Sequence, residues 1–286
     1  MNARLVELRL GYNTNGFPFH RLDDAIEIIA EIGYRGVALT PDVHHLDPYR
    51  ATAADVAGLR SRLERLGLVC VVETGARFLL DSRRKHWPTL LSEDRAPVRV
   101  DFLRRSIHLA ADLGALVVSF WSGSKDGEPR PLSEDLATLA DRCRPLLDEA
   151  QRSGVTMALE PEPGMVIDGL DAFRRFDAEL ADPRLSLTLD VGHLHLTEDL
   201  PPEACVRAWA HRLVNVHVDD MRRPVHEHLA FGEGEISFPP VLEALREIDF
   251  EGLASVELGR HGHVAVETAT HAIKFLRSMT GRRSGA

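Results

Sequence analysis

Residues 151–160 read QRSGVTMALE and contain the pattern that decides the fold. The end of a polar, helix-like segment is followed by Gly154 and then by a short apolar run that finishes at Glu160. Glycine just past a helix adopts the left-handed conformation at little cost, so Gly154 is a candidate helix stop. The stretch therefore predicts a helix, a tight turn and a buried strand that carries a carboxylate at its end.

The same pattern recurs along the chain. Gly33 comes before GVAL, Gly67 before LVCVVE and Gly114 before ALVVSF. Later in the chain, a modified form of the pattern gives the strand segments DPRLSLTLD, HRLVNVHVD and EGLASVELG. With VELRLG near the start, these segments give eight candidate strands. They lie near residues 5–10, 37–40, 69–73, 116–120, 155–160, 186–190, 213–218 and 253–258.

Amphipathic helical segments lie between these strands. Asp23 and Asp24 fall in the first turn of one, where the helix dipole favours them. Another opens with Thr52, a candidate N-cap, and has Asp55 three residues later, close to a capping box. Pro145 predicts a kink or a break in a third.

The strands are mostly continuous apolar runs, which is typical of parallel strands covered by helices. Eight strand–helix units without a Pro/Gly/Ser-rich linker favour an α/β fold, a (β/α)8 TIM barrel, as a single domain over residues 1–286 with a frayed tail at about 281–286. Residues 74–96 are expected to form a loop over the barrel mouth. An open doubly wound sheet is the alternative, but LRLGYNTNGF lacks its GxGxxG turn.

Composition excludes several classes of protein. The chain has 286 residues, 34 Lys and Arg against 44 Asp and Glu, and a formal net charge of -10, which argues against a nucleic-acid partner. Cys70, Cys143 and Cys205 are too few and too far apart for a disulfide framework or a cysteine zinc site. No apolar run is long enough for a signal peptide or a membrane span, so we expect a soluble cytoplasmic protein without a membrane partner.

Four consecutive strands end in residues that bind metals. The fifth ends in Glu160, the sixth in Asp190 and the eighth in Glu257, and His217 lies near the end of the seventh. Any one of these is more often a cap, an ion-pair partner or a core residue, but four at the same rim are harder to explain that way. Buried carboxylates this close would repel unless some were protonated or a cation lay among them. Oxygen ligands with one imidazole suit Mn²⁺, Mg²⁺, Co²⁺ or Zn²⁺.

Longer motifs around these residues resemble the xylose isomerase-like TIM barrel superfamily. They are LEPEP at Glu160, DVGH from Asp190, HVDDMRR from His217, EHLAFGEGEISF from Glu227 and SVE at Glu257. That superfamily includes sugar isomerases and 3-epimerases (sugar phosphate isomerases and epimerases among them), inosose dehydratase, 3-dehydroshikimate dehydratase and endonuclease IV, an AP endonuclease. The resemblance implies that the four strand-end residues are the metal ligands, with Mn²⁺ as the first candidate ion.

The resemblance also implies that His193 and Arg223 contact the substrate. From the residues alone, His193 could instead be a structural partner of Asp190, and Arg223 could equally be a solvated loop charge. Glu162 is a candidate substrate contact or alternate metal ligand, and Trp121 could stack on a sugar face or simply form the barrel wall. Other polar residues near the strand ends are candidate pocket residues, each more often structural than catalytic. They are Asn13, Asn15, Asp42, His44, Glu73 and His228.

One branch of the superfamily fits poorly. Endonuclease IV holds three zinc ions with additional histidines from earlier strands. Here the third strand ends in Glu73 and the fourth in Phe120 and Trp121. DNA repair is therefore disfavoured, in agreement with the acidic charge.

A metal flanked by two glutamates suits proton transfer beside a carbonyl through an enediolate. Glu160 and Glu257 come from non-adjacent strands and could face opposite sides of the substrate as catalytic bases and acids. The sequence therefore predicts a metal-dependent isomerase or epimerase of a small ketose or polyol ketone. If a β-hydroxyl leaves the substrate, the enzyme is instead a dehydratase of the inosose or 3-dehydroshikimate type. A non-catalytic binding barrel is a further alternative. The chain could also form a homo-oligomer.

Overall fold

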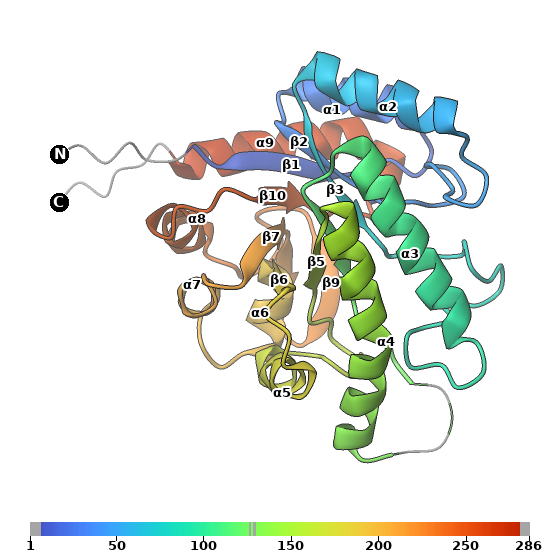
Figure 1. The fold of residues 1–286 in the computed structure, drawn as a ribbon. Helices are drawn as coiled ribbons and strands as arrows, with labels where there is room; N and C mark the ends of the chain where they lie inside the picture. Colours follow the sequence, from blue (N-terminus) through green and yellow to red (C-terminus); the bar gives the residue numbers. More distant parts are fainter. Residues whose placement is uncertain (1–6, 126, 128–129, 281–286) are drawn as a thin grey trace.

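The computed structural model describes residues 7–125, 127 and 130–280 and shows a closed parallel barrel (Figure 1). Its strands are β1 (Arg9–Asn13), β2 (Gly36–Leu39), β3 (Val69–Glu73), β4 (Val117–Phe120), β5 (Thr156–Leu159), β6 (Leu185–Asp190), β7 (Leu213–Val218) and β10 (Leu253–Val256). They pair in the order β1-β10-β7-β6-β5-β4-β3-β2 and close between β1 and β2. The predicted (β/α)8 barrel is confirmed, and the tail at 281–286 lies outside the described residues.

Helices surround the barrel (Figure 1). They are α1 (Leu22–Ile32), α2 (Ala53–Leu66), α3 (Ala96–Leu113), α4 (Leu132–Ser153), α5 (Leu170–Leu180), α6 (Val191–Thr197), α7 (Pro202–Ala208), α8 (Phe238–Glu247) and α9 (Ala265–Thr280), with short 3₁₀ turns at Thr14–Gly16 and Gly262–Val264. A hairpin of β8 (Asp220–Arg222) and β9 (Val225–Leu229) follows β7. Among the described residues, none of the helices combines the length and the apolar character needed to span a membrane.

The predicted helix ends are confirmed. Gly33, Gly67, Gly114 and Gly154 cap α1 to α4 in the left-handed conformation, with φ of 103°, 64°, 67° and 68°. Because non-glycine side chains strain this conformation, the four glycines explain why each helix stops directly before a strand.

Two predicted helix starts are confirmed, namely the capping box of Thr52 and Asp55 and the acidic first turn of α1. The break predicted at Pro145 is wrong, because α4 continues to Ser153. Pro145 and Asp141, whose carbonyl the proline leaves without an N–H partner, are both exposed. Water can therefore satisfy that carbonyl without ending the helix.

The first strand begins later than predicted. The expected strand was 5–10, whereas β1 runs over Arg9–Asn13. Gly11, Tyr12 and Asn13 pair with β2 and are buried, so a strand end with polar groups is hidden in the barrel. The search for apolar runs missed this end because Asn13 is polar.

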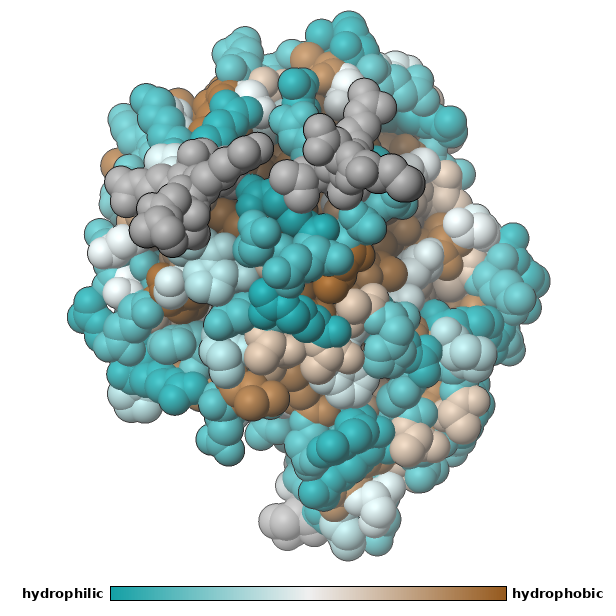
Figure 2. All heavy atoms as spheres, turned by 90° about the vertical axis from the view of Figure 1, so that its left-hand side faces the viewer, coloured by the Kyte–Doolittle hydropathy of each residue, from teal (hydrophilic) through white to brown (hydrophobic). Residues whose placement is uncertain are grey.

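The lower part of the barrel interior is filled with small apolar side chains. Ala38, Val71, Val117, Ala158 and Leu253 form a buried cluster there. Polar residues occupy the carboxyl ends of the same strands, where chemistry occurs in this fold. Figure 2 shows the other end, near the start of β1, where mostly hydrophilic side chains mix with scattered hydrophobic ones.

The segment between β3 and α3 contains no helix or strand among its described residues and contributes to the cavity at the barrel mouth, as predicted. Buried Arg99 of α3 holds this segment in place. Its guanidinium donates to the carbonyl oxygens of Thr74 (2.9 Å), His86 (3.1 Å) and Pro88 (2.8 Å). It therefore ties both ends of the loop to one helix.

We expect Arg99→Met to lower the free energy of unfolding by about 3–5 kcal/mol. Three carbonyl oxygens lose their hydrogen-bond donor and must then remain unpaired or bind water instead. Urea unfolding followed by circular dichroism measures this. Arg104→Met, on the exposed face of the same helix, is the matched control and should change stability by less than about 0.5 kcal/mol. Equal effects of the two substitutions would contradict the assigned role.

Candidate metal centre and active-site cavity

The structure brings together the four strand-end residues singled out in the sequence. Glu160 follows β5, Asp190 ends β6, His217 lies in β7 and Glu257 follows β10, and these strands are neighbours in the barrel. Each residue offers a ligand atom within 4.8 Å of those of the others. The parallel register explains this, since Asp190 pairs with His217 and Ser255 pairs with His217 on its other side.

His217 lies at the middle of the group and is buried. Its Nδ1 is 3.0 Å from Oε1 of Glu160 and 3.1 Å from Oε2 of Glu257, and its Nε2 is 2.9 Å from Oε1 of Glu73. Burial acts to lower the pKa of His217, but the three carboxylates outweigh it and hold the pKa well above its ordinary value. Without a metal ion, a proton on this ring balances part of the negative charge.

Asp190 has one carboxylate oxygen that is available to bind a cation. Its Oδ1 accepts a hydrogen bond from the backbone N–H of His193 at 2.9 Å. Its Oδ2 is buried and has no hydrogen-bond partner within the described part of the chain. Burial and the neighbouring carboxylates Asp219 and Glu160 raise the pKa of Asp190 well above its usual range. A buried acceptor left unpaired costs about 1–3 kcal/mol, which a cation at this point would remove.

The two glutamates of the group are shifted in opposite directions. Burial raises the pKa of Glu160, and the nearby Glu257 and Glu73 add to that rise. Burial also acts to raise the pKa of Glu257, but the charge of His217 and a 2.7 Å hydrogen bond from Asn15 lower it. The pair can therefore hold one carboxylic acid and one carboxylate at the same time.

The donor set fits a divalent metal ion. Three carboxylates and one imidazole are ligands that suit Mn²⁺, Mg²⁺, Co²⁺ or Zn²⁺. His217 turns Nδ1 toward Glu160 and Glu257, while Glu73 accepts from Nε2 and orients the ring. Carboxylate partners of this kind commonly hold a metal-binding imidazole in place.

A cavity of about 590 Å³ opens above this group. Glu73, Glu160, Glu162 and Glu257 are among the acidic residues that line it. Its other lining residues include Asn15, Thr40, Arg77, Lys85, His86, Trp121, His226, His228 and Arg260. A pocket of this size suits a small polar molecule.

Trp121 and Glu162 lie where the sequence placed them, on the cavity wall. The Trp121 ring stacks on His86, with ring centres 5.6 Å apart, and packs below the Arg99 guanidinium. Burial and the nearby Glu160 raise the pKa of Glu162 to about 8.

His193 is buried on α6 and is not among the described residues that line the cavity. Its Nδ1 is 3.2 Å from the carbonyl oxygen of Pro161 and its Nε2 is 2.9 Å from Nε2 of His226. It therefore lies behind the cavity wall, with His226 in front of it.

The structure does not bring Arg223 to the cavity. Arg223 sits at the turn of the β8–β9 hairpin, is exposed, and donates to the carbonyl oxygens of His195 and Glu198. Those bonds fasten the hairpin to α6, so its place is explained by packing instead of the expected substrate contact.

Four of the candidate pocket residues from the sequence lie at the site. Glu73 holds His217, Asn15 donates to Glu257, and Asn13 and His228 line the cavity. Glu73 ends β3 in VCVVE just as Glu160 ends the run VTMALE, and that likeness was the signal available in the sequence.

Comparisons with known proteins agree with this architecture. L-ribulose-5-phosphate 3-epimerase UlaE of Shigella flexneri serotype 5b is 29% identical over 205 residues, which is 69% of this chain and 70% of that protein. A structure of D-allulose 3-epimerase from Methylomonas sp. superposes with a TM-score of 0.73 at 19% identity, over 95% of this chain and 98% of the other. The IOLI protein with a bound zinc atom superposes with a TM-score of 0.77 at 17% identity, over 97% and 100%.

The family model described as xylose isomerase-like TIM barrel matches residues 26–279, which include every strand from β2 to β10 and all four strand-end residues of the candidate metal centre. The chain belongs to the xylose isomerase-like TIM barrel family.

Proposed function

We propose that the chain is a divalent-metal-dependent sugar epimerase that acts on a ketose. The observation that carries the proposal is the convergence of Glu160, Asp190, His217 and Glu257, three of which (Glu160, His217 and Glu257) line the 590 Å³ cavity. The similarity to L-ribulose-5-phosphate 3-epimerases supports a ketose substrate.

In this proposal the same four side chains hold the ion, with Mn²⁺ as the first candidate. A bound divalent ion supplies positive charge that stabilises negative charge on substrate oxygens. Glu73 orients His217, and the backbone N–H of His193 orients Asp190.

Glu160 and Glu257 move the proton. One carboxylate takes the proton from the carbon beside the substrate carbonyl, and the other carboxyl group gives a proton to the same carbon from the opposite face. Two strands, β6 and β7, separate β5 from β10, so the two glutamates come from the outer strands of the four, and both contact Nδ1 of His217. Their opposed pKa shifts provide one acceptor and one donor, and the carbon is inverted.

Trp121 and Glu162 contact the substrate in this proposal. Trp121 lines the cavity and offers apolar contact to a sugar, and Glu162 offers a carboxyl group to its hydroxyls. In this proposal His193 and Arg223 do not contact the substrate, because neither side chain lines the cavity.

The proposal is tested by proton exchange. The manganese-loaded protein is incubated in heavy water with L-ribulose 5-phosphate, D-allulose or D-tagatose and followed by NMR. We expect deuterium at the carbon beside the carbonyl and formation of the epimer at that carbon from at least one of these ketoses. A conjugated product that absorbs in the near ultraviolet would indicate a dehydratase instead. No exchange in any of them, with metal content verified, would contradict the proposal.

Glu73→Gln is expected to weaken Mn²⁺ binding by about 10–100-fold, because the partner that orients His217 loses its charge. Gln keeps an oxygen that can accept from Nε2 of His217, so the fold should survive. Titration of Mn²⁺ followed by electron paramagnetic resonance measures the affinity. An unchanged dissociation constant would show that Glu73 does not support the metal centre.

A further inference from the structure

A second cavity, of about 480 Å³, adjoins the active-site cavity. The two cavities share part of their wall, which is formed by Asn15, Thr40, Arg77, Gly259 and Arg260. The side chain of Asn15 also donates to Glu257 at 2.7 Å, so the shared wall lies next to the candidate metal centre. We call the second cavity the annex. A substituent on a molecule bound at the metal centre is within reach of it.

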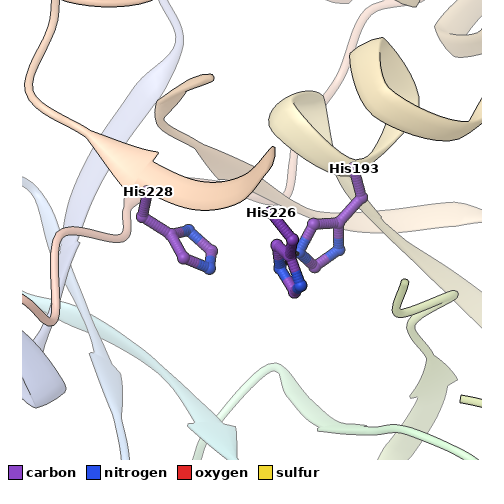
Figure 3. Close-up of side chains that lie close together, drawn as sticks. All are labelled: His193, His226 and His228. Carbon is purple, nitrogen blue, oxygen red and sulfur yellow. Dashed lines mark hydrogen bonds between the residues drawn. The ribbon is translucent and has the colours of Figure 1, made fainter. Parts of the chain in front are cut away.

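The annex lies on one side of the barrel mouth. Its lining residues follow β1, β2, β3 and β10, which are neighbours in the barrel. Figure 3 draws three histidines from another side, on α6 and β9, namely His193, His226 and His228. Among the described residues, neither these histidines nor the four residues of the candidate metal centre line the annex. The annex is therefore distinct from the groups that hold the metal.

Three apolar side chains that project into solvent line the annex. Phe19 is 79% exposed, Val43 57% and Phe78 46%, and each belongs to a different loop. Single exposed apolar side chains are common on protein surfaces, but a group of them around one hollow marks a place where a ligand or a partner binds. Because this hollow is concave and adjoins the active site, a small molecule fits it better than the surface of another protein does.

Close packing holds the loops of the annex in place. A Cβ at Gly262 would lie 2.5 Å from Cγ of Pro18, so the loop after β10 packs directly on the loop after β1. Asp42 and His45 exchange two backbone hydrogen bonds, of 2.7 and 3.1 Å, in the loop after β2. Nε2 of His45 lies 3.1 Å from the carbonyl oxygen of His20, which fixes this turn against the first loop. The annex is therefore formed by loops that are pinned to one another.

The shared wall is polar, in contrast to the apolar side chains beyond it. Nη2 of Arg77 donates to the carbonyl oxygen of Asn15 at 3.2 Å. A Cβ at Gly259 would lie 2.6 Å from the same nitrogen, so the glycine leaves room for the guanidinium in the wall. Sugar hydroxyls can form hydrogen bonds with such a wall, whereas phenylalanine and valine side chains offer them none. The lining therefore suits a ligand that is polar near the metal centre and apolar at its far end.

We propose that the annex binds an apolar substituent of about the size of a phenyl ring, carried on the end of the ketose that is remote from the reacting carbon. This inference rests on the proposed function, because the sugar bound at the metal centre brings the substituent to the annex. Cavities of about 300–1,000 Å³ hold ligands of drug size, so the active-site cavity of about 590 Å³ accommodates an unsubstituted ketose without the annex. The annex adds space and apolar surface for a second group. Phe19 and Phe78 are then residues that determine substrate specificity.

The test compares a benzyl ether with a methyl ether on the last carbon of D-tagatose, D-allulose and L-ribulose. The manganese-loaded full chain is titrated with each ether by calorimetry and assayed for epimer formation by NMR. Burial of the phenyl ring predicts a dissociation constant about 10–100-fold lower for the benzyl ether, and a kcat/KM higher by a similar factor. Phe19→Ser/Phe78→Ser should bring both ratios close to one. Leu200→Ser, at a leucine that is 59% exposed and is not among the described residues lining either cavity, is the matched control and should keep the wild-type ratios.

A second double variant and circular dichroism guard against misfolding. Phe19→Leu/Phe78→Leu keeps the annex apolar and should keep most of the preference for the benzyl ether. Tighter binding of the benzyl ether without turnover of any ether would contradict the proposed function and support the annex. Equal binding and turnover of the two ethers would overturn the annex and leave the proposed function standing. If the ethers bind equally and the serine variant has a lower molecular mass by light scattering, a second copy covers the annex and the inference is wrong.

Discussion

Replacing Glu257 with glutamine is expected to lower kcat for ketose epimerisation by about 10³–10⁴-fold, with a similar loss for Glu160→Gln. Glutamine has nearly the same volume and can still accept the hydrogen bond that Asn15 gives to Glu257. It cannot take or give the proton, because an amide does not titrate in the useful range. Since both faces of the carbon need a group, either substitution alone should block inversion.

The assay is formation of the epimer, followed by NMR at saturating Mn²⁺, so that weaker metal binding is not mistaken for lost proton transfer. Glu251→Gln, an exposed glutamate before β10, is the matched control and should keep wild-type rates. Rates within tenfold of wild type in both active-site variants would contradict the roles given to the two glutamates. Unchanged metal content in the double variant Glu160→Gln/Glu257→Gln would count against them as ligands.

Asp190→Asn is expected to weaken metal binding without destabilising the metal-free protein. Metal at a thousandfold excess over its dissociation constant should raise the unfolding free energy of wild type by about 4 kcal/mol, and the variant should lose most of that gain. In metal-free protein the variant should be as stable as wild type or more so, because a buried carboxyl group with a raised pKa becomes a neutral amide. Asparagine keeps the oxygen that accepts from the N–H of His193.

Urea unfolding with chelator and with Mn²⁺ measures both effects. An equal metal-induced gain in wild type and variant would show that Asp190 is not a ligand. A large loss of stability in the metal-free variant would show instead that its carboxylate serves the fold.

The fold could be predicted because its determinants are local. Gly154 and its three counterparts end helices through backbone conformation, which depends on the residue and its neighbours alone. Continuous apolar runs then identify the buried strands. The end of β1 could not be placed this way, since polar Asn13 becomes buried only when β2 pairs with it.

The site was predictable where the strand register determines it. The residues at or near the ends of the predicted strands include the four site residues Glu160, Asp190, His217 and Glu257. The β8–β9 hairpin has no such constraint, because only its packing on α6 decides which side chains face inward. That packing sends Arg223 outward, and His226 and His228 inward.

Anomalous diffraction from a crystal soaked in Mn²⁺ tests the central claim most directly. The account predicts a peak within about 2.5 Å of a carboxylate oxygen from each of Glu160, Asp190 and Glu257 and of Nδ1 of His217. A crystal whose manganese peaks all lie away from these four side chains would contradict it.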